Sequence, residues 1–509
     1  MLTRILSLLA VCFTLSGATA QIATEQVAGT NTTDADAMKT KANYTVFIPD
    51  PGELPTSQAQ EIFPDPLDIR IDIDFEKTMP ALRALHGVTN YTPLHGPSCS
   101  YPYDLKTMIR DLHIPCSYFH DDPYVNPGRN LIDVSRIFPL FHADENDPAN
   151  YIFNETDDYL RTVVEDGVRI IYRLGETIEV GTHYRTRPPK DYAKWTRICL
   201  NIVRHYTQGW GNGFHWPMKD WAVWEEPNNP NLWHGDFEEY LQLYKVFAPE
   251  FKKHFPDLNV GGPQTTTIGY RFLEQFLKFV RDEKLPLDFV NYTAYYLTPA
   301  ELLSESVKRR EMLDQYGFHS VPLGTNEWHC SPRWYAFSDP VGYGKERRRF
   351  GGVEGAVFAA AVLCGMQDTP LQHACFYSIR IPGGYGIFDG DDRPTATYYV
   401  FHRFARIFTN STRRLATSIA NASANTQSIA SVDKQGNIEV LCGCYSLVRG
   451  QLSFGIPEGY TPERVEQIND DCHPRFAEMD GAMVGVQDGR VTLSKHECAT
   501  AYYLKFVRK

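Results

Sequence analysis

Between residues 80 and 408, segments typical of buried strands alternate eight times with segments typical of amphipathic helices. Short apolar runs bounded by turn residues predict the strands, and apolar positions that recur every three to four residues predict the helices. Such alternation indicates parallel βα units, because parallel strands need a long crossover connection. We therefore expect an α/β fold, a (β/α)₈ TIM barrel with enlarged loops. Its strands are expected near residues 85, 116, 168, 221, 259, 287, 323 and 373.

The pattern changes after about residue 409, where short strand-like runs are separated by turn signals such as Gly436-Asn437 and Asp488-Gly489. Runs of this kind predict a smaller C-terminal β-sandwich with antiparallel strands over residues 409–509. Before the barrel, residues 43–79 form an extended segment in which Ile69–Phe75 alternates apolar and polar side chains. Alternation of this period predicts a half-exposed strand, and the segment is a candidate partner for the sandwich.

The N-terminus has the three parts of a secretory signal peptide. A charged start at Met1–Arg4 precedes the apolar stretch Ile5–Leu15, and the small residues Ala18–Ala20 form a cleavage site. We expect residues 1–20 to be removed after Ala20 and the protein to be secreted; the alternative is an uncleaved anchor. Residues 21–42 show no periodicity and are expected to be a disordered lead-in. No other run is long enough to cross a membrane.

Cysteines and glycosylation motifs agree with an extracellular, oxidising location. The chain has 11 cysteines and seven Asn-x-Ser/Thr motifs, so we expect a glycoprotein with disulfide bonds. Cys364 and Cys375 lie in apolar patterns and are expected to be buried thiols. Pairing cannot be deduced from sequence, but Cys99/Cys116 and Cys472/Cys498 are the candidate disulfides.

The net charge of −12 argues against a nucleic-acid partner, because phosphate backbones require basic clusters. Two apolar runs instead deliver carboxyl groups to strand ends: Asp220–Asn229 carries Glu225 and Glu226, and Val321–Trp328 carries Glu327. Functional side chains of a barrel enzyme lie at the carboxyl ends of its strands. A pair of carboxyl groups is what glycoside hydrolysis requires. Further polar residues expected at these ends are His120, Asp121, Arg173, Gln264 and Tyr295.

Three motifs in this order resemble glycoside hydrolase family 39: Trp224-Glu225-Glu226-Pro227-Asn228, Val260-Gly261-Gly262-Pro263 and Asn326-Glu327-Trp328. That family belongs to a clan of retaining barrel glycosidases and includes β-xylosidases and α-L-iduronidases. The resemblance implies that Glu226 is the acid/base and Glu327 the nucleophile after the fourth and seventh strands. It implies neither a cofactor nor a metal.

The resemblance also suggests substrate contacts. His120 matches a family histidine, Tyr295 would donate its hydroxyl proton to Glu327, and Trp328 would offer a stacking face. Arg173, or Arg380, would suit a carboxylated sugar. Each of these side chains also has a structural interpretation, as a core aromatic, a lone histidine or an ion pair.

Two positions depart from the family pattern. Glu225 replaces an asparagine that binds the sugar 2-hydroxyl, and Thr293 replaces a histidine. An ionised Glu225 accepts hydrogen bonds but cannot donate them. The substrate could differ at that hydroxyl, the acid/base pKa could be tuned differently, or catalysis could be lost. Glu225 could also point away, because neighbouring strand residues face opposite sides.

These features predict a secreted retaining glycosidase whose partner is a polysaccharide or oligosaccharide, with β-xylosidase-like exo-action as the first expectation. The alternatives are a glycosidase for another linkage, such as an α-L-glycoside or a uronic acid, and a barrel that binds glycans without catalysis.

Overall fold

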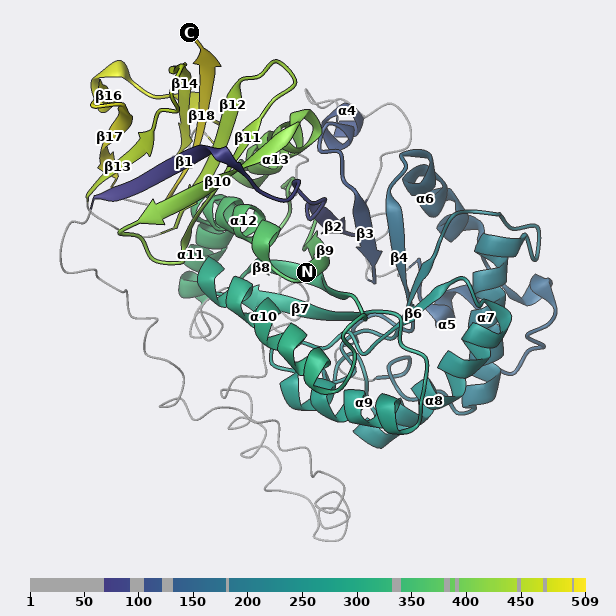
Figure 1. The fold of residues 1–509 in the computed structure, drawn as a ribbon. Helices are drawn as coiled ribbons and strands as arrows, with labels where there is room; N and C mark the ends of the chain where they lie inside the picture. The colour runs from purple at the N-terminus through teal and green to yellow at the C-terminus, as the bar shows by residue number, and fades with distance from the viewer. Residues whose placement is uncertain are drawn as a thin grey trace.

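The computed structural model describes residues 68–91, 105–120, 131–179, 183–331, 340–379, 385–389, 393–445, 450–469, 474–496 and 499–509. These residues form a barrel and a large second sheet, which lie side by side (Figure 1). The predicted signal peptide and lead-in, together with Cys99, Cys472 and Cys498, lie outside the described residues.

Eight parallel strands form the barrel, in the order β6-β5-β4-β3-β2-β9-β8-β7. Parallel bridges between Gly261 and Phe289 and between Thr265 and Tyr292 close the ring between β6 and β7. The predicted (β/α)₈ barrel is therefore confirmed, with one strand at each expected place. The strands are β2 (Gly87–Thr89), β3 (Cys116–Phe119), β4 (Arg169–Leu174), β5 (Asp220–Val223), β6 (Asn259–Gly261), β7 (Val290–Tyr296), β8 (Leu323–Cys330) and β9 (Leu371–Phe376).

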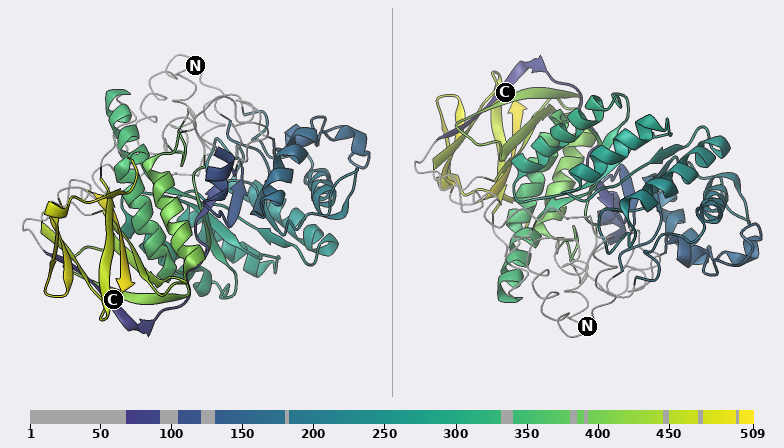
Figure 2. Two further views of the ribbon diagram at one scale, coloured as in Figure 1. Left: turned by 90° about the horizontal axis from the view of Figure 1, so that it is seen from above. Right: turned by 90° about the horizontal axis from the view of Figure 1, so that it is seen from below.

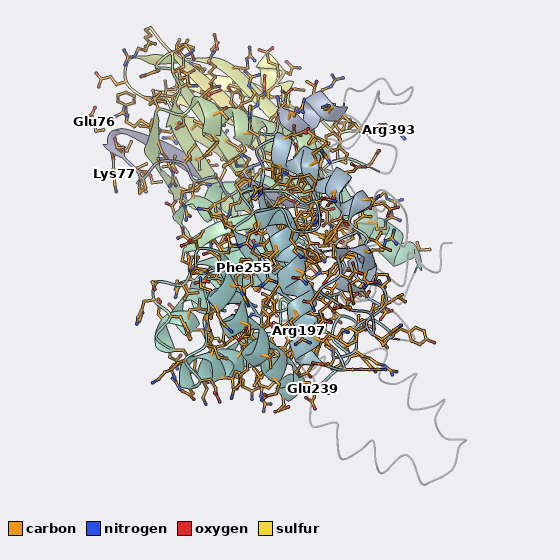
Figure 3. The ribbon with its side chains drawn as sticks, turned by 90° about the vertical axis from the view of Figure 1, so that its right-hand side faces the viewer. Glu76, Lys77, Arg197, Glu239, Phe255 and Arg393 are labelled. Carbon is orange, nitrogen blue, oxygen red and sulfur yellow. The ribbon has the colours of Figure 1, made fainter. Side chains whose placement is uncertain are left out.

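Helices surround this ring, and Figure 3 shows Arg197 and Glu239 on the outer layer, toward the opposite end of the molecule from Glu76 and Lys77. Asp236 caps one helix through a reciprocal bond with Glu239. The helices are α4 (Leu105–Arg110), α5 (Val134–Ile137), α6 (Asn154–Glu165), α7 (Tyr192–Gln208), α8 (Phe237–His254), α9 (Tyr270–Asp282), α10 (Pro299–Gln315), α11 (Pro340–Gly351), α12 (Val353–Gly365) and α13 (Ala396–Asn410).

The second sheet has the order β15-β14-β18-β12-β11-β10-β1-β13-β17-β16. β1 pairs antiparallel with β10 and parallel with β13. The sheet is therefore mixed. The described strands after residue 409 pair antiparallel with one another, and the parallel pair arises because β1, which precedes the barrel in the sequence, lies between β10 and β13. Its strands are β1 (Ile69–Thr78), β10 (Arg413–Ala420), β11 (Thr426–Val432), β12 (Ile438–Cys444), β13 (Gly450–Gly455), β14 (Tyr460–Ile468), β15 (Ala477–Glu478), β16 (Val484–Gln487), β17 (Arg490–His496) and β18 (Thr500–Arg508).

Helix α12 joins the two parts. It is apolar on all sides, as expected of a helix buried on every face, and it packs against β8 of the barrel and β11 and β12 of the second sheet. Figure 2 shows the helices of this region between the barrel and the second sheet. The close approach depends on Gly443 of β12, where a Cβ atom would lie 2.2 Å from the Ala361 backbone nitrogen.

The cysteines correct one expectation. Cys116 is a free, buried thiol whose Sγ lies 4.0 Å from Cys375 Sγ inside the barrel, so the structure does not support its pairing with Cys99. Cys364 and Cys375 are buried thiols, as predicted. Within the described ranges, no single helix has the length and apolar composition of a membrane span, although the bent pair Gly344–Gly351 and Val353–Asp368 meets both criteria when taken together.

We predict that Gly443→Ala lowers the free energy of unfolding by about 1–3 kcal/mol, because a methyl group there overlaps the backbone of α12. Gly485→Ala on β16 is the matched control, since its added Cβ would meet nothing nearer than 3.8 Å. Urea unfolding of both variants measures the difference. Equal stability of the two variants would contradict the proposed close contact.

Candidate active site

The chain leaves β5 in a strained conformation that turns Glu225 and Glu226 into the barrel mouth. Trp224 and Glu226 have φ angles of +64° and +37°, in the left-handed region that side chains rarely adopt. Hydrogen bonds from Trp224 N to Leu174 O (2.8 Å) and from Glu226 N to Gln264 O (2.9 Å) hold this backbone against the neighbouring strands. Because the chain is no longer extended here, the two adjacent carboxyl groups are both buried inside rather than on opposite faces.

Aromatic packing supports this turn from outside. Trp224 Nε1 donates to Leu232 O at 2.6 Å, and its ring packs against Trp195 and Trp233. Gly175 leaves room for that ring, since a Cβ atom there would lie 3.0 Å from it. Trp233 is thus a packing residue.

Glu226 lies in surroundings that favour its protonated form. It is 5% exposed, and burial followed by the charge of Glu327 raises the pKa of Glu226 to about 7. The hydrogen bond from Asn229 and the nearby Thr293 hydroxyl act in the opposite direction. The Asn229 bond, from Nδ2 to Oε2, is 2.9 Å long. A carboxyl group with this pKa is suited to general acid catalysis near neutral pH.

Glu327 has a close contact on each of its two carboxyl oxygens. His120 Nε2 is 2.7 Å from Oε1, and the Tyr295 hydroxyl donates to Oε2 at 2.7 Å. The Tyr295 contact with Glu327 was predicted, whereas His120 was expected to contact the substrate and lies against Glu327 instead. Two carboxyl groups in one pocket with opposite surroundings are typical of an acid paired with a nucleophile or base.

Glu225 points into the same pocket. Its Oε1 accepts a hydrogen bond from Asn326 Nδ2 at 2.8 Å, and its Oε2 contacts the Tyr118 hydroxyl. Burial raises the pKa of Glu225 well above its usual value, and the charges of Glu327 and Glu226 act in the same direction. The charge of His120 and the Tyr118 bond act against them. Glu225 therefore faces into the pocket rather than away from it.

Among the described residues, His120, Glu225 and Glu327 bring one nitrogen and two oxygen atoms within 4.8 Å of one another. Tetrahedral ligands at ~2.1 Å from a zinc ion stand about 3.4 Å apart. The 2.7 Å between His120 Nε2 and Glu327 Oε1 is shorter than that and is a hydrogen-bond distance. As arranged here, His120 and Glu327 therefore stand closer together than two ligands of one zinc ion would.

Two of the predicted substrate contacts are completely buried. Arg173 donates to Asp133 Oδ1 at 2.6 Å and to the backbone oxygen of His120, so it supports His120 from behind. Trp328 packs against Phe376 and Phe401 in the layer between β8, β9 and α13, because it follows Glu327 in an extended strand and faces the other side. Neither side chain has surface to offer a sugar. Asp121 and Arg380 lie outside the described residues.

Three residues of the pocket were not predicted: Tyr118, Asn229 and Asn326. Tyr118 carried a signal, since it precedes His120 by two residues and therefore shares its face of the strand. A separate hollow of about 450 Å³ between the loops after β4 and β5 includes none of the three carboxyl groups. It is lined by Arg187, Pro188, Pro189, Lys190, Tyr192, His234 and Glu239.

Comparisons with known proteins agree with this site. Residues 131–375 match the profile of the glycosyl hydrolases family 39. A β-xylosidase of Geobacillus stearothermophilus is 33% identical over 175 residues, which cover 30% of this chain and 34% of that protein. Residues 131–375 belong to glycoside hydrolase family 39. This family-39 chain is also similar to an α-1,4-L-rhamnosidase of Formosa agariphila, at 21% identity over 163 residues that cover 31% of each protein. Both alignments span about a third of the curated relative.

Solved structures share the fold over most of the family-39 chain. A glucosidase from Croceicoccus marinus has a TM-score of 0.65 at 22% identity and covers 87% of this chain and 100% of its own. A GH39 enzyme from Xanthomonas axonopodis pv. citri has a TM-score of 0.62 at 16% identity, with 88% and 99% covered. A monomeric β-xylosidase from Caulobacter crescentus has a TM-score of 0.61 at 15% identity, with 86% and 99% covered.

The raised pKa of Glu226 predicts a pH-dependent stability. The folded state holds this proton more tightly than the unfolded state, so the stabilisation is complete below pH ~4.3 and is lost as the pH rises through about 7. Relative to Glu226→Gln, the wild type should lose on the order of a few kcal/mol of unfolding free energy between pH ~5 and ~8. Urea unfolding at both values measures this loss.

The control is Glu478→Gln, which removes the same charge from an exposed position on β15. It should keep the pH dependence of the wild type. If Glu226→Gln behaved like this control, the pKa of Glu226 would not be raised.

Proposed function

We propose that this family-39 protein hydrolyses O-glycosidic bonds by double displacement, with retention of the anomeric configuration. The observation that carries the proposal is the contrast between two buried carboxyl groups in one barrel mouth. Glu226 binds a proton near neutral pH, whereas Glu327 receives contacts from His120 and Tyr295 that stabilise a charge. A retaining glycosidase needs such a pair, ~5–5.5 Å apart.

In the first step, Glu327 attacks the anomeric carbon while Glu226 protonates the departing glycosidic oxygen. The bond from the anomeric carbon to the leaving oxygen breaks, and an ester to Glu327 forms. His120 and Tyr295 hold the attacking carboxylate in place, because each contacts one of its two oxygens.

In the second step, Glu226 removes a proton from water, and the hydroxide attacks the anomeric carbon and releases Glu327. The charge of Glu327 is the second-largest cause of the raised pKa of Glu226. Formation of the ester neutralises that charge and therefore lowers the pKa of Glu226. The residue thus becomes a base at the step that needs one.

For the substrate we propose β-xylosidase-like exo-action on an oligosaccharide or polysaccharide, supported by the similarity to the Geobacillus β-xylosidase. Another glycosidic linkage is the second candidate, supported by the similarity to the α-1,4-L-rhamnosidase. Recognition of a uronic acid through Arg173 has no support in its buried position. Secretion is proposed from residues 1–20 alone.

We predict that Glu327→Ala lowers kcat on aryl glycosides by about 10³-fold or more, because the attacking group is gone. Added azide should restore turnover of the Glu327→Ala variant with inverted product, and of Glu226→Ala with retained product. Proton NMR of the first-formed sugar reports the anomer. An inverted product from the wild type would contradict double displacement, and glycan binding without any turnover would favour the non-catalytic alternative.

We predict that Tyr295→Phe lowers kcat/KM by roughly 10–100-fold, because a hydrogen bond to an ionised group is worth about 1.5–3 kcal/mol. Tyr316→Phe is the matched control, since the Tyr316 hydroxyl also donates to a carboxyl group, Glu274, at 2.6 Å on the outside of the barrel. Steady-state kinetics of both variants measure the effect. Similar losses in the two variants would mean that the Tyr295 bond has no role in the reaction.

A further inference from the structure

We propose that Glu225 is a positioning residue that acts as a neutral carboxylic acid, with its proton on Oε2 between the Tyr118 hydroxyl and the pocket. The catalytic consequence rests on the proposed function, whereas the protonation itself does not. Neutral Glu225 leaves a single negative charge, on Glu327, when Glu226 is also protonated.

Glu225 lacks a lysine or arginine partner within the described part of the chain. Glu225 is completely buried, and among the described residues no lysine or arginine forms an ion pair with it. A buried carboxylate without such a partner is strongly disfavoured. His120 is the cationic candidate among the described residues of the pocket; its charge acts on Glu225, but its Nε2 makes its close contact with Glu327, at 2.7 Å.

The carboxyl groups of the pocket also lie close together. Glu225 and Glu327 each place an oxygen in a group of atoms that lie within 4.8 Å of one another. Two carboxyl groups this close in a desolvated pocket do not both ionise, so one of them keeps a proton. Glu226 lies on the same side and adds a third carboxyl group to the repulsion.

The partners of each carboxyl group decide which of the two keeps the proton. Glu327 has the partners that stabilise a charge, an imidazole and a phenol. Glu225 has the Asn326 amide on Oε1, which makes Oε1 the carbonyl oxygen, and the Tyr118 hydroxyl on Oε2. A hydroxyl accepts a hydrogen bond as well as it donates one, so Tyr118 accommodates a proton on Oε2.

The groups around Glu225 come from several elements. β3 and its end contribute Tyr118 and His120, the turn after β5 contributes Glu226, and β8 contributes Asn326 and Glu327. Two further charge interactions reach this group of residues: one between Arg173 of β4 and Tyr118, and one between Tyr240 of α8 and Glu225.

Neutral Glu225 also explains why a glutamate is tolerated where the family pattern has an asparagine. A protonated carboxyl group offers one acceptor oxygen and one donor, as a side-chain amide does. An ionised carboxylate would offer acceptors only and would add a charge beside Glu226. The substitution therefore preserves both the polarity and the net charge of the position.

The test compares pH profiles of kcat/KM for the wild type, Glu225→Gln and Glu225→Asp. If Glu225 is neutral, glutamine replaces one uncharged group by another. The alkaline limb, set by Glu226 near pH 7, should then keep its position in Glu225→Gln, whatever the change in the absolute kcat/KM. Glu225→Asp keeps the ionisable group but shortens its reach to Tyr118, and it should lose more activity than Glu225→Gln.

An ionised Glu225 predicts a different pH profile. If Glu225 is ionised, the glutamine variant removes a negative charge from beside Glu226, and the alkaline limb moves to lower pH. That shift would overturn the inference. Loss of activity on treatment with a chelator, restored by added zinc, would also overturn it. A metal cation rather than a proton would then balance the negative charges of Glu225 and Glu327.

Infrared difference spectroscopy tests the protonation without any turnover. The carbonyl stretch of a protonated carboxylic acid should be present in Glu226→Gln at pH 8 and absent from the Glu225→Gln/Glu226→Gln double variant. The contribution of Glu176, whose pKa is raised to about 8 chiefly by burial, cancels in the difference. Absence of the band with normal turnover would overturn the protonation of Glu225 and leave the proposed function unaffected. Presence of the band without glycosidase activity would overturn the proposed function and leave the protonation of Glu225 established.

Discussion

Burial of three carboxyl groups in one barrel mouth is the constraint on which this site depends. Glu225, Glu226 and Glu327 are almost inaccessible to water, and repulsion keeps them from all being charged together. Each receives different partners from the surrounding strands: Asn229 and Thr293 for Glu226, His120 and Tyr295 for Glu327, and Tyr118 and Asn326 for Glu225. The chemical differences among three identical side chains therefore arise from their neighbours.

The backbone and the outer layers make this crowding possible. Two residues after β5 adopt the left-handed conformation, and such strain persists only where the surrounding structure holds it. The Trp224 ring is held by Trp195 and Trp233, and Arg173 supports His120 from behind. On the opposite side of the barrel, α12 fills the space between β8, which carries Glu327, and the second sheet.

The sequence predicted the barrel well because buried parallel strands appear as continuous apolar runs. It missed α11, whose glycines and charged residues give little apolar periodicity. It indicated antiparallel strands after the barrel and a candidate partner strand before it, but the parallel pairing of β1 with β13 follows from no local pattern. For the site, His120, Tyr295, Glu226 and Glu327 could be expected at strand ends, whereas the burial of Arg173 and Trp328 depends on which way each side chain points.

By itself, the sequence determined the order of strands and helices, the family, and the residues that end the fourth and seventh barrel strands, because local apolar patterns and short motifs carry that information. Only the tertiary structure decided that Glu225 faces inward, that Glu226 and Glu327 have opposite surroundings, and that Arg173 and Trp328 belong to the packing. The physical reason is that the protonation and the accessibility of a side chain depend on partners that come from distant parts of the chain, such as Asn326 for Glu225, 101 residues away.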